Sequence, residues 1–370
     1  MTVPQMFFGK ALKIDLSESK IEEIHPEDSL YRERIGGAGI LSALLKDTEG
    51  DCIALGVGPL TGTPCPAGSA VVACSSSDDG VLRFAPILLS GGLEFKLSGF
   101  DFVTITGKSP EPSYLWIRDM MADIVRYPDS LSADCWETCS RIRKEQGDPR
   151  IQVISCSEGE SASLNFTSGW DGIGFGSKMR CMNLKAIAFR GMADVGLHDP
   201  EAFLEKSSAM MKTSPSALAG KTGFSSLLGD SYQTVAGLKR ARACFSCPFP
   251  CLSYAESGDS SHPQFLMLDQ RTFLSYSGQG MSSEMILRQM SSEHRKGIAR
   301  TGFINALDTI TNGVAESEIV AVAYILGLCP RYMGLFNPGI EKYCELLGMG
   351  LGVEVGKERL VEIARSLLRS

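Results

Sequence analysis

The chain has 370 residues, of which 44% are hydrophobic and 21% are charged, and its formal net charge is −7. These values describe an ordinary globular protein that is long enough for two domains. The negative charge argues against a nucleic-acid or anionic-membrane surface, and no run approaches the roughly 18 apolar residues of a membrane span. Twelve scattered cysteines indicate a reducing compartment, and the first residues show no secretory signal, so we expect a cytoplasmic protein.

The first 120 residues alternate strands with glycine-rich turns. The two strands of an opening hairpin and four later strands are expected at residues 6–16, 21–24, 52–57, 70–74, 102–106 and 114–117. A short helix is expected within residues 90–101. The glycines of residues 35–45 open another helix, but the third glycine of a dinucleotide-binding turn is missing, so close packing is the preferred interpretation.

The periodicity of the sequence changes near residue 200. Before that point we expect a helix at 134–145 and strands at 151–156 and within 183–191, separated by a second glycine cluster. After it, helices are expected at residues 201–211, 281–295, 316–328 and 357–368, with a polar loop at 253–261. The sequence therefore predicts an α+β protein with a β-rich domain at 1–199 and a mainly helical domain at 200–370.

The most specific motif is a C-x2-C-x3-C run formed by Cys244, Cys247 and Cys251. Three thiols at this spacing can turn their sulfurs toward one soft-metal centre. Pro248 and Pro250 lie inside the run, fix its backbone and prevent it from continuing as a helix. The motif therefore predicts a preformed loop that binds a metal or a cluster.

A fourth thiolate must come from elsewhere in the chain. Cys329 is the preferred candidate because it follows an apolar helical run and precedes Pro330, which ends that run. Cys344 is the reserve candidate. Two alternatives stay open for these cysteines: a zinc site with four thiolates, or buried thiols that act as small hydrophobic residues or include one disulfide.

Several polar residues could belong to the same site or to the surface. Arg240 and Arg242 precede the first thiol and could donate to cluster sulfides or attract an acidic electron carrier, although an exposed basic turn is preferred. Glu94 and Lys96 are compatible with a solvated helix start. The four histidines are dispersed and are expected to be surface or capping residues: His25, His198, His262 and His294.

Six segments together resemble the aldehyde ferredoxin oxidoreductases, which are tungsten-pterin enzymes with a nearby 4Fe-4S cluster. These segments occur in the family's order at residues 58–63, 94–101, 106–108, 183–188, 244–251 and 327–329. The resemblance implies that Cys244, Cys247, Cys251 and Cys329 are the four cluster ligands. A cluster of this kind also implies an anaerobic source.

The resemblance is incomplete where the family binds its pterin. Ala38 and Gly172 stand where the family's glycine turns carry arginines. Residues 294–299 and Tyr324 stand where the family has its two aspartate motifs. Because each unpaired buried polar group costs about 1–3 kcal/mol, these changes predict a degenerate or absent site for a tungsten or molybdenum bis-pterin.

The segment between the two aspartate motifs is also short. Only the 24 residues 300–323 separate them, which is room for roughly one helix and a loop. We therefore expect an electron-transfer protein with one 4Fe-4S cluster, working with ferredoxin or another redox subunit, alone or in a homo- or hetero-oligomer. Two alternatives are an active tungsten or molybdenum aldehyde oxidoreductase completed by a partner chain, and a scaffold with a structural cluster. No catalytic residue is assigned.

Overall fold

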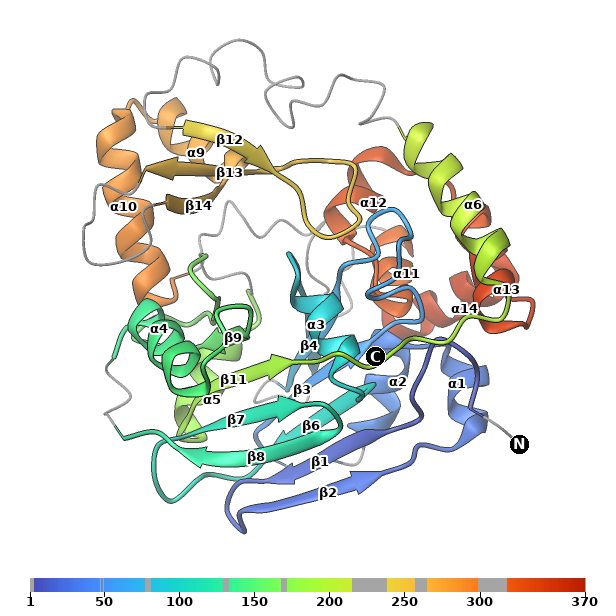
Figure 1. The fold of residues 1–370 in the computed structure, drawn as a ribbon, viewed down its shortest axis with the longest axis horizontal. Coiled ribbons are helices and arrows are strands. Elements are labelled where there is room, and N and C mark those ends of the chain that lie inside the picture. The colour runs from blue at the N-terminus through green and yellow to red at the C-terminus, as the bar shows by residue number, and fades with distance from the viewer. Residues whose placement is uncertain are drawn as a thin grey trace.

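The computed structural model has an α+β fold, as predicted, with two large sheets in its N-terminal half and a mostly helical C-terminal region (Figure 1). The structure describes residues 3–46, 48, 50–76, 81–128, 133–167, 172–214, 238–256, 265–298 and 318–369. In these ranges, no helix combines the length and the apolar character that crossing a bilayer requires.

The first sheet contains six strands. Their spatial order is β2 (Lys20–Ile24), β1 (Ala11–Asp15), β6 (Phe102–Thr106), β3 (Cys52–Val57), β4 (Val71–Ser76) and β5 (Leu82–Ile87). The predicted hairpin is present as β1 and β2, and β1 pairs in parallel with β6. β5 is absent from the predicted strands because Pro86 lies within it. The strand forms the edge of the sheet, where a missing backbone donor is tolerated.

The second sheet contains five shorter strands. Their order is β10 (Ser163–Leu164), β9 (Gln152–Ser155), β11 (Leu184–Arg190), β7 (Ser113–Arg118) and β8 (Met121–Arg126). Helix α4 (Cys135–Gln146) contacts β9 and β11. Helices α3 (Gly91–Leu97) and α5 (Phe175–Cys181) each contact strands of both sheets, so they lie between the two sheets.

Side chains of the first sheet enter two different cores because successive residues of a strand point to opposite faces. In β3, Ile53, Leu55 and Val57 join the core shared with the second sheet, whereas Cys52 and Ala54 join the core shared with the helices. All six residues of β3 are buried. A strand buried on both faces explains the continuous apolar run in the sequence.

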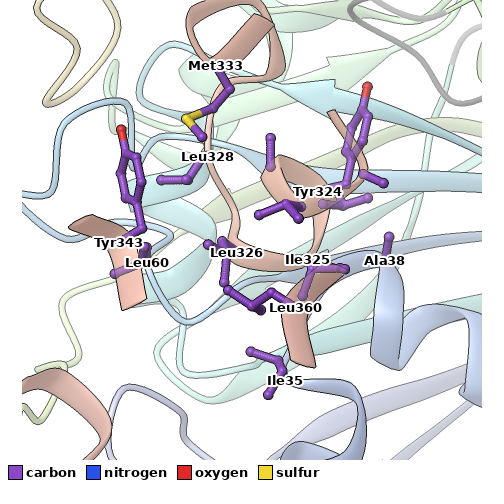
Figure 2. Packing of buried hydrophobic residues seen from close by; sticks show 14 of the residues in the cluster. Ile35, Ala38, Leu60, Tyr324, Ile325, Leu326, Leu328, Met333, Tyr343 and Leu360 are labelled. Carbon is purple, nitrogen blue, oxygen red and sulfur yellow. The ribbon is translucent and has the colours of Figure 1, made fainter. Parts of the chain in front are cut away.

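Helices from both ends of the chain share a core with the other face of the first sheet, where α2 contacts β3 and β4. They are α1 (Asp28–Arg34), α2 (Gly37–Leu44), α6 (Pro200–Lys212), α11 (Glu318–Leu326), α12 (Pro330–Phe336), α13 (Ile340–Leu351) and α14 (Lys357–Leu367). α11 packs against α2, α12 and α14. Figure 2 shows Ile325 and Leu326 of α11 gathered with Ile35, Leu60 and Leu360. The predicted division at residue 199 falls between β11 and α6 and stays a prediction, since residues on both sides of it share this core.

The C-terminal region also contains a small antiparallel sheet. It consists of β12 (Leu238–Arg242), β13 (Leu252–Glu256) and β14 (Phe265–Asp269), followed by α9 (Gln270–Gly278) and α10 (Ser283–Lys296). The prediction of a polar loop at 253–261 is therefore wrong for its first four residues; the remainder lies outside the described residues. Ser253 and Ala255 are buried on one face of β13, and this alternation specifies a strand despite the polar composition.

Candidate metal centre

The structure places the loop of the C-x2-C-x3-C motif near the segment that contains Cys329, which directly precedes α12. The loop connects β12 to β13 and reaches toward α12 (Figure 1). Cys244, Cys251 and Cys329 are buried, with 7%, 6% and 4% exposure, and Cys247 is partly exposed. All twelve cysteines lie within the described residues and none forms a disulfide, so the alternative of a disulfide in this motif is not supported.

The other three thiols contribute to the electrostatic surroundings of Cys247. Burial raises the pKa of Cys247 well above its usual value, and Cys329, Cys244 and Cys251 raise it further. Burial also raises the pKa of Cys244 and of Cys251 to about 12. The raised pKa values of Cys244, Cys247 and Cys251 favour the protonated thiol in the absence of a cation. A bound metal would have to release their protons, as cysteine ligands require.

Ala67 connects the two parts of the site through its backbone. Its amide donates to the carbonyl of Ser246 at 2.8 Å, and its carbonyl accepts from the amide of Cys329 at 2.9 Å. Ala67 has a φ of +64°, which is uncommon for a residue with a side chain. The amide of Phe245 also donates to the carbonyl of Leu89, at 3.0 Å. The N-terminal half therefore fixes the position of the thiol loop.

Two glycines allow the turn before Cys329 to lie against the first sheet. A Cβ on Gly58 would lie 2.0 Å from the backbone carbon of Leu326, and one on Gly327 would lie 1.9 Å from Thr61 Oγ1. Gly37 is similarly close to the end of α11. These contacts confirm that the glycines of this region serve close packing.

Arg331 is a residue of the site that the motif does not reveal. Its Nη1 donates to the Sγ of Cys251 at 3.8 Å and also pairs with Asp269. The side chains of Arg331 and Asp269 are 4% and 1% exposed. The only sequence signal is an arginine two residues after Cys329, and the carboxylate partner comes from the end of β14.

A fifth thiol, that of Cys65, lies near the ring of Tyr343, whose hydroxyl donates to the carbonyl of the neighbouring Pro66 at 3.3 Å. Cys65 is fully buried, and burial raises its pKa well above the usual value. Tyr343 lies in the same region: burial raises its pKa, and Cys65, Cys247 and Cys329 all contribute further. Cys65 follows the turn at residues 58–63 that carries part of the family resemblance, which is the signal that could have identified it.

The reserve candidate, Cys344, lies in different surroundings. It is half-buried on α13, and burial raises its pKa to about 11, with further contributions from Glu341 and Glu358. None of the four thiols contributes to that shift. Within the described ranges, no three His, Cys, Asp or Glu side chains are positioned to hold one metal ion.

Two predicted surface residues are buried. His294 is fully buried on α10 beside Trp136, with ring centroids 6.4 Å apart, and burial lowers the pKa of His294 to about 3. Lys96 is also fully buried, with its Nζ 3.5 Å from Asp101. These predictions were wrong because both side chains face tertiary cores that local sequence does not reveal. Arg242, by contrast, is exposed on β12.

A buried carboxylate network surrounds Lys96. Asp101 accepts hydrogen bonds from the backbone amides of Phe8 and Gly9 and from the hydroxyl of Tyr31. The ammonium of Lys96 also lies 4.5 Å from the centroid of the Phe7 ring. This network fixes the first residues of the described chain to the end of α3.

The fold defines a class of protein with two sheets in its N-terminal half and a cysteine-bearing loop that lies next to the C-terminal helices. Residues 11–191 match the family model of the aldehyde ferredoxin oxidoreductase N-terminal domain. Residues 11–191 therefore form a domain of the aldehyde ferredoxin oxidoreductase N-terminal type, and the chain is similar, at low identity, to enzymes of that family.

Curated relatives agree with this assignment. The chain is 27% identical over 216 residues to the tungsten-containing aldehyde ferredoxin oxidoreductase of Pyrococcus furiosus, an alignment that covers 53% of this chain and 35% of the relative. It is 25% identical over 311 residues to the Pyrococcus abyssi enzyme of the same name. This alignment covers 70% of this chain and 51% of the relative. It is also 25% identical over 215 residues to the aliphatic sulfonate oxidoreductase, WOR-like subunit, of Pyrococcus furiosus. This alignment covers 50% of this chain and 34% of the relative. The chain thus matches about a third to a half of the length of these relatives.

A solved structure has a similar fold along almost the whole chain. It is described as the active site complex BamBC of benzoyl coenzyme A reductase in complex with 1,5-dienoyl-CoA. The TM-score is 0.68 at 18% sequence identity, and the match covers 98% of this chain and 60% of that one. At this identity the likeness concerns the fold.

Proposed function

We propose that this protein binds one 4Fe-4S cluster through Cys244, Cys247, Cys251 and Cys329 and transfers electrons. The observation that supports the proposal is the backbone of Ala67, which connects the loop of Cys244, Cys247 and Cys251 to the segment of Cys329 through two hydrogen bonds. Three of the four thiols are buried and a guanidinium lies against one. Four thiols in a dry shell with a nearby cation are a donor set that suits an anionic iron-sulfur cage.

The residues of the site have separable roles. The four thiols would lose their protons and hold the cluster, and Ala67 keeps the two thiol-bearing segments together. The buried surroundings exclude water, while the partly exposed Cys247 provides the side of the site closest to solvent. When bound, the cluster would supply one-electron chemistry at a potential set by charge, hydrogen bonds and exposure.

A cluster suits these thiols better than a single zinc ion. A structural zinc site brings four ligands within about 2.3 Å of one centre. The described residues contain no such group of three ligands, although the four thiols are electrostatically coupled. The four thiols would instead hold an iron-sulfur cluster, which would supply one-electron chemistry.

We further propose that the pterin site is degenerate. The residues at the family's pterin positions are packed into the core: Ala38, His294 and Tyr324 are all fully buried. A Cβ on Gly37 would lie 1.9 Å from the carbonyl oxygen of Tyr324, so the glycine turn directly contacts the end of α11. The protein would then work beside another redox subunit or ferredoxin. An active tungsten or molybdenum enzyme completed by a partner chain, and a scaffold with a structural cluster, are the alternatives.

Elemental analysis of protein purified without oxygen tests the proposal. We expect about four iron and four sulfide per chain with no tungsten, molybdenum or pterin, and a reversible EPR signal on reduction. Replacing any of the four ligand cysteines by serine should lower the iron content, whereas Cys344→Ser should leave it unchanged. Tungsten with pterin would support the enzyme alternative, an irreducible cluster the scaffold, and zinc alone would overturn the assignment.

A further inference from the structure

We infer that Arg331 and Asp269 are positioning residues that set the reduction potential of the cluster through Cys251. The inference rests on the proposed function, since it concerns the same four-thiol site. It adds a second layer of residues to the ligands and assigns opposite electrostatic effects to the two members of a buried ion pair.

The guanidinium of Arg331 is directed at one cluster ligand. Arg331 lies in the first turn of α12, and its Nη1 donates to the Sγ of Cys251 at 3.8 Å. The same nitrogen pairs with the carboxylate of Asp269. Because both side chains are nearly inaccessible to solvent, water and salt screen their charges only weakly.

Asp269 is held in place by the start of α9. Its Oδ1 accepts from the amide of Thr272 at 2.9 Å and from the Thr272 hydroxyl at 3.3 Å, which leaves Oδ2 for the arginine. The junction of β14 and α9 therefore fixes the carboxylate.

The same junction fixes the cysteine. The amide of Gln270 donates to the carbonyl of Cys251 at 3.2 Å. The side chain of Gln270 donates to the carbonyls of Pro250 and Leu252 at 3.1 and 3.0 Å. The ligand and the carboxylate that orients the arginine thus belong to one rigid unit.

The sign of each effect follows from the charges. Reduction adds one electron to an anionic cage, so a nearby guanidinium stabilises the reduced state more than the oxidised state and raises the potential. Asp269 opposes this effect from a position behind the arginine. Arginine suits this geometry because the two hydrogens of its Nη1 lie in the fixed plane of the guanidinium and can be directed at the sulfur and the carboxylate, which the point charge of lysine reproduces less well.

A redox titration of the anaerobically purified protein, followed by EPR, tests the inference. Arg331→Gln should lower the equilibrium constant for reduction about tenfold or more, which corresponds to a midpoint about 59 mV more negative for one electron. Arg331→Lys should give a smaller negative shift, and Asp269→Asn a positive one. The double variant Arg331→Gln/Asp269→Asn should shift less than Arg331→Gln alone.

Arg190→Gln is the matched control. Arg190 also forms a partly buried pair, with Glu94, at side-chain exposures of 15% and 13%, and its partners include no cysteine. The midpoint potential of the Arg190→Gln variant should equal that of the wild type.

The outcomes separate this inference from the proposed function. If the wild-type chain binds no iron, the proposed function fails. If it binds four iron and Arg331→Gln leaves the midpoint unchanged, only the inference fails. An equal shift in Arg190→Gln would also overturn it. If the Arg331→Gln variant does not assemble a cluster, the Asp269→Asn variant serves as the test. A midpoint potential of that variant that is no more positive than the wild-type value would refute the inference.

Discussion

The amide of Cys329 donates a hydrogen bond to the carbonyl of Ala67 at 2.9 Å, although the two residues come from opposite ends of the chain. Because the amide of Ala67 in turn donates to Ser246, one residue of the N-terminal half connects both thiol-bearing segments. The cluster site of the proposed function thus depends on the packing between the two halves of the chain.

Substitutions of Ala67 should distinguish backbone hydrogen bonding from side-chain packing. Ala67→Pro removes the donor to Ser246 and cannot adopt a φ of +64°, so we expect a loss of about 3 kcal/mol or more and a lower iron content. Ala67→Gly keeps the donor and tolerates this φ, so its stability should lie within about 1 kcal/mol of wild type. Chemical denaturation and iron analysis measure both effects. Equal behaviour of the two variants would contradict the role assigned to this backbone.

Gly58 should not tolerate a side chain. In Gly58→Ala the new Cβ would lie 2.0 Å from the backbone of Leu326, so the turn before Cys329 must shift; we expect a loss of about 3 kcal/mol and a lower iron content. The control is Gly348→Ala in α13, where nothing lies within 4 Å of the added atom. It should gain about 0.5–1 kcal/mol because alanine favours the helix. Thermal melts of both variants test the pair, and unchanged stability of Gly58→Ala would disprove the close contact.

His294 should make stability depend on pH. Burial lowers the pKa of His294 to about 3 in the fold, whereas an unfolded histidine has a pKa near 6.5. The unfolded state therefore binds the proton first, so the contribution of His294 is fully present above about pH 6.5 and is lost as the pH falls toward 3. Below pH 6 the free energy of unfolding should fall by about 1.4 kcal/mol per pH unit because of this residue alone.

Denaturation of His294→Phe between pH 5 and 7.5 measures that contribution. The variant should show a shallower slope than the wild type. A parallel slope in His294→Phe would mean that the ring is hydrated or charged in the fold.

Lys96 and Asp101 should behave as a buried ion pair. Burial lowers the pKa of Lys96 and raises the pKa of Asp101, and their mutual attraction opposes both shifts. Lys96→Met leaves the carboxylate buried without its cation, so we expect a loss of about 3–5 kcal/mol by chemical denaturation. Arg118→Met, which breaks an exposed pair with Asp123, should cost less than about 1 kcal/mol. A neutral result for Lys96→Met would show that the pair is uncharged.

The sequence alone determined the elements whose signals are local. The alternation of β1, the apolar run of β3, the hairpin turn and the helices α6, α10, α11 and α14 follow from side-chain periodicity and turn residues. The C-x2-C-x3-C spacing with its two prolines likewise identified three thiols that lie in one loop. The order of short motifs pointed to the aldehyde ferredoxin oxidoreductase family, which the match over residues 11–191 supports independently.

Only the tertiary structure decided which distant groups meet. It placed Cys329 against Ala67, Arg331 between Cys251 and Asp269, and His294 inside a core, because such contacts depend on packing between segments that are remote in sequence. β13 was missed for the same reason: its polar residues form a strand because β12 and β14 supply the hydrogen-bond partners. Local sequence specifies what a segment can form, whereas the partners that satisfy its buried groups are fixed only by the complete fold.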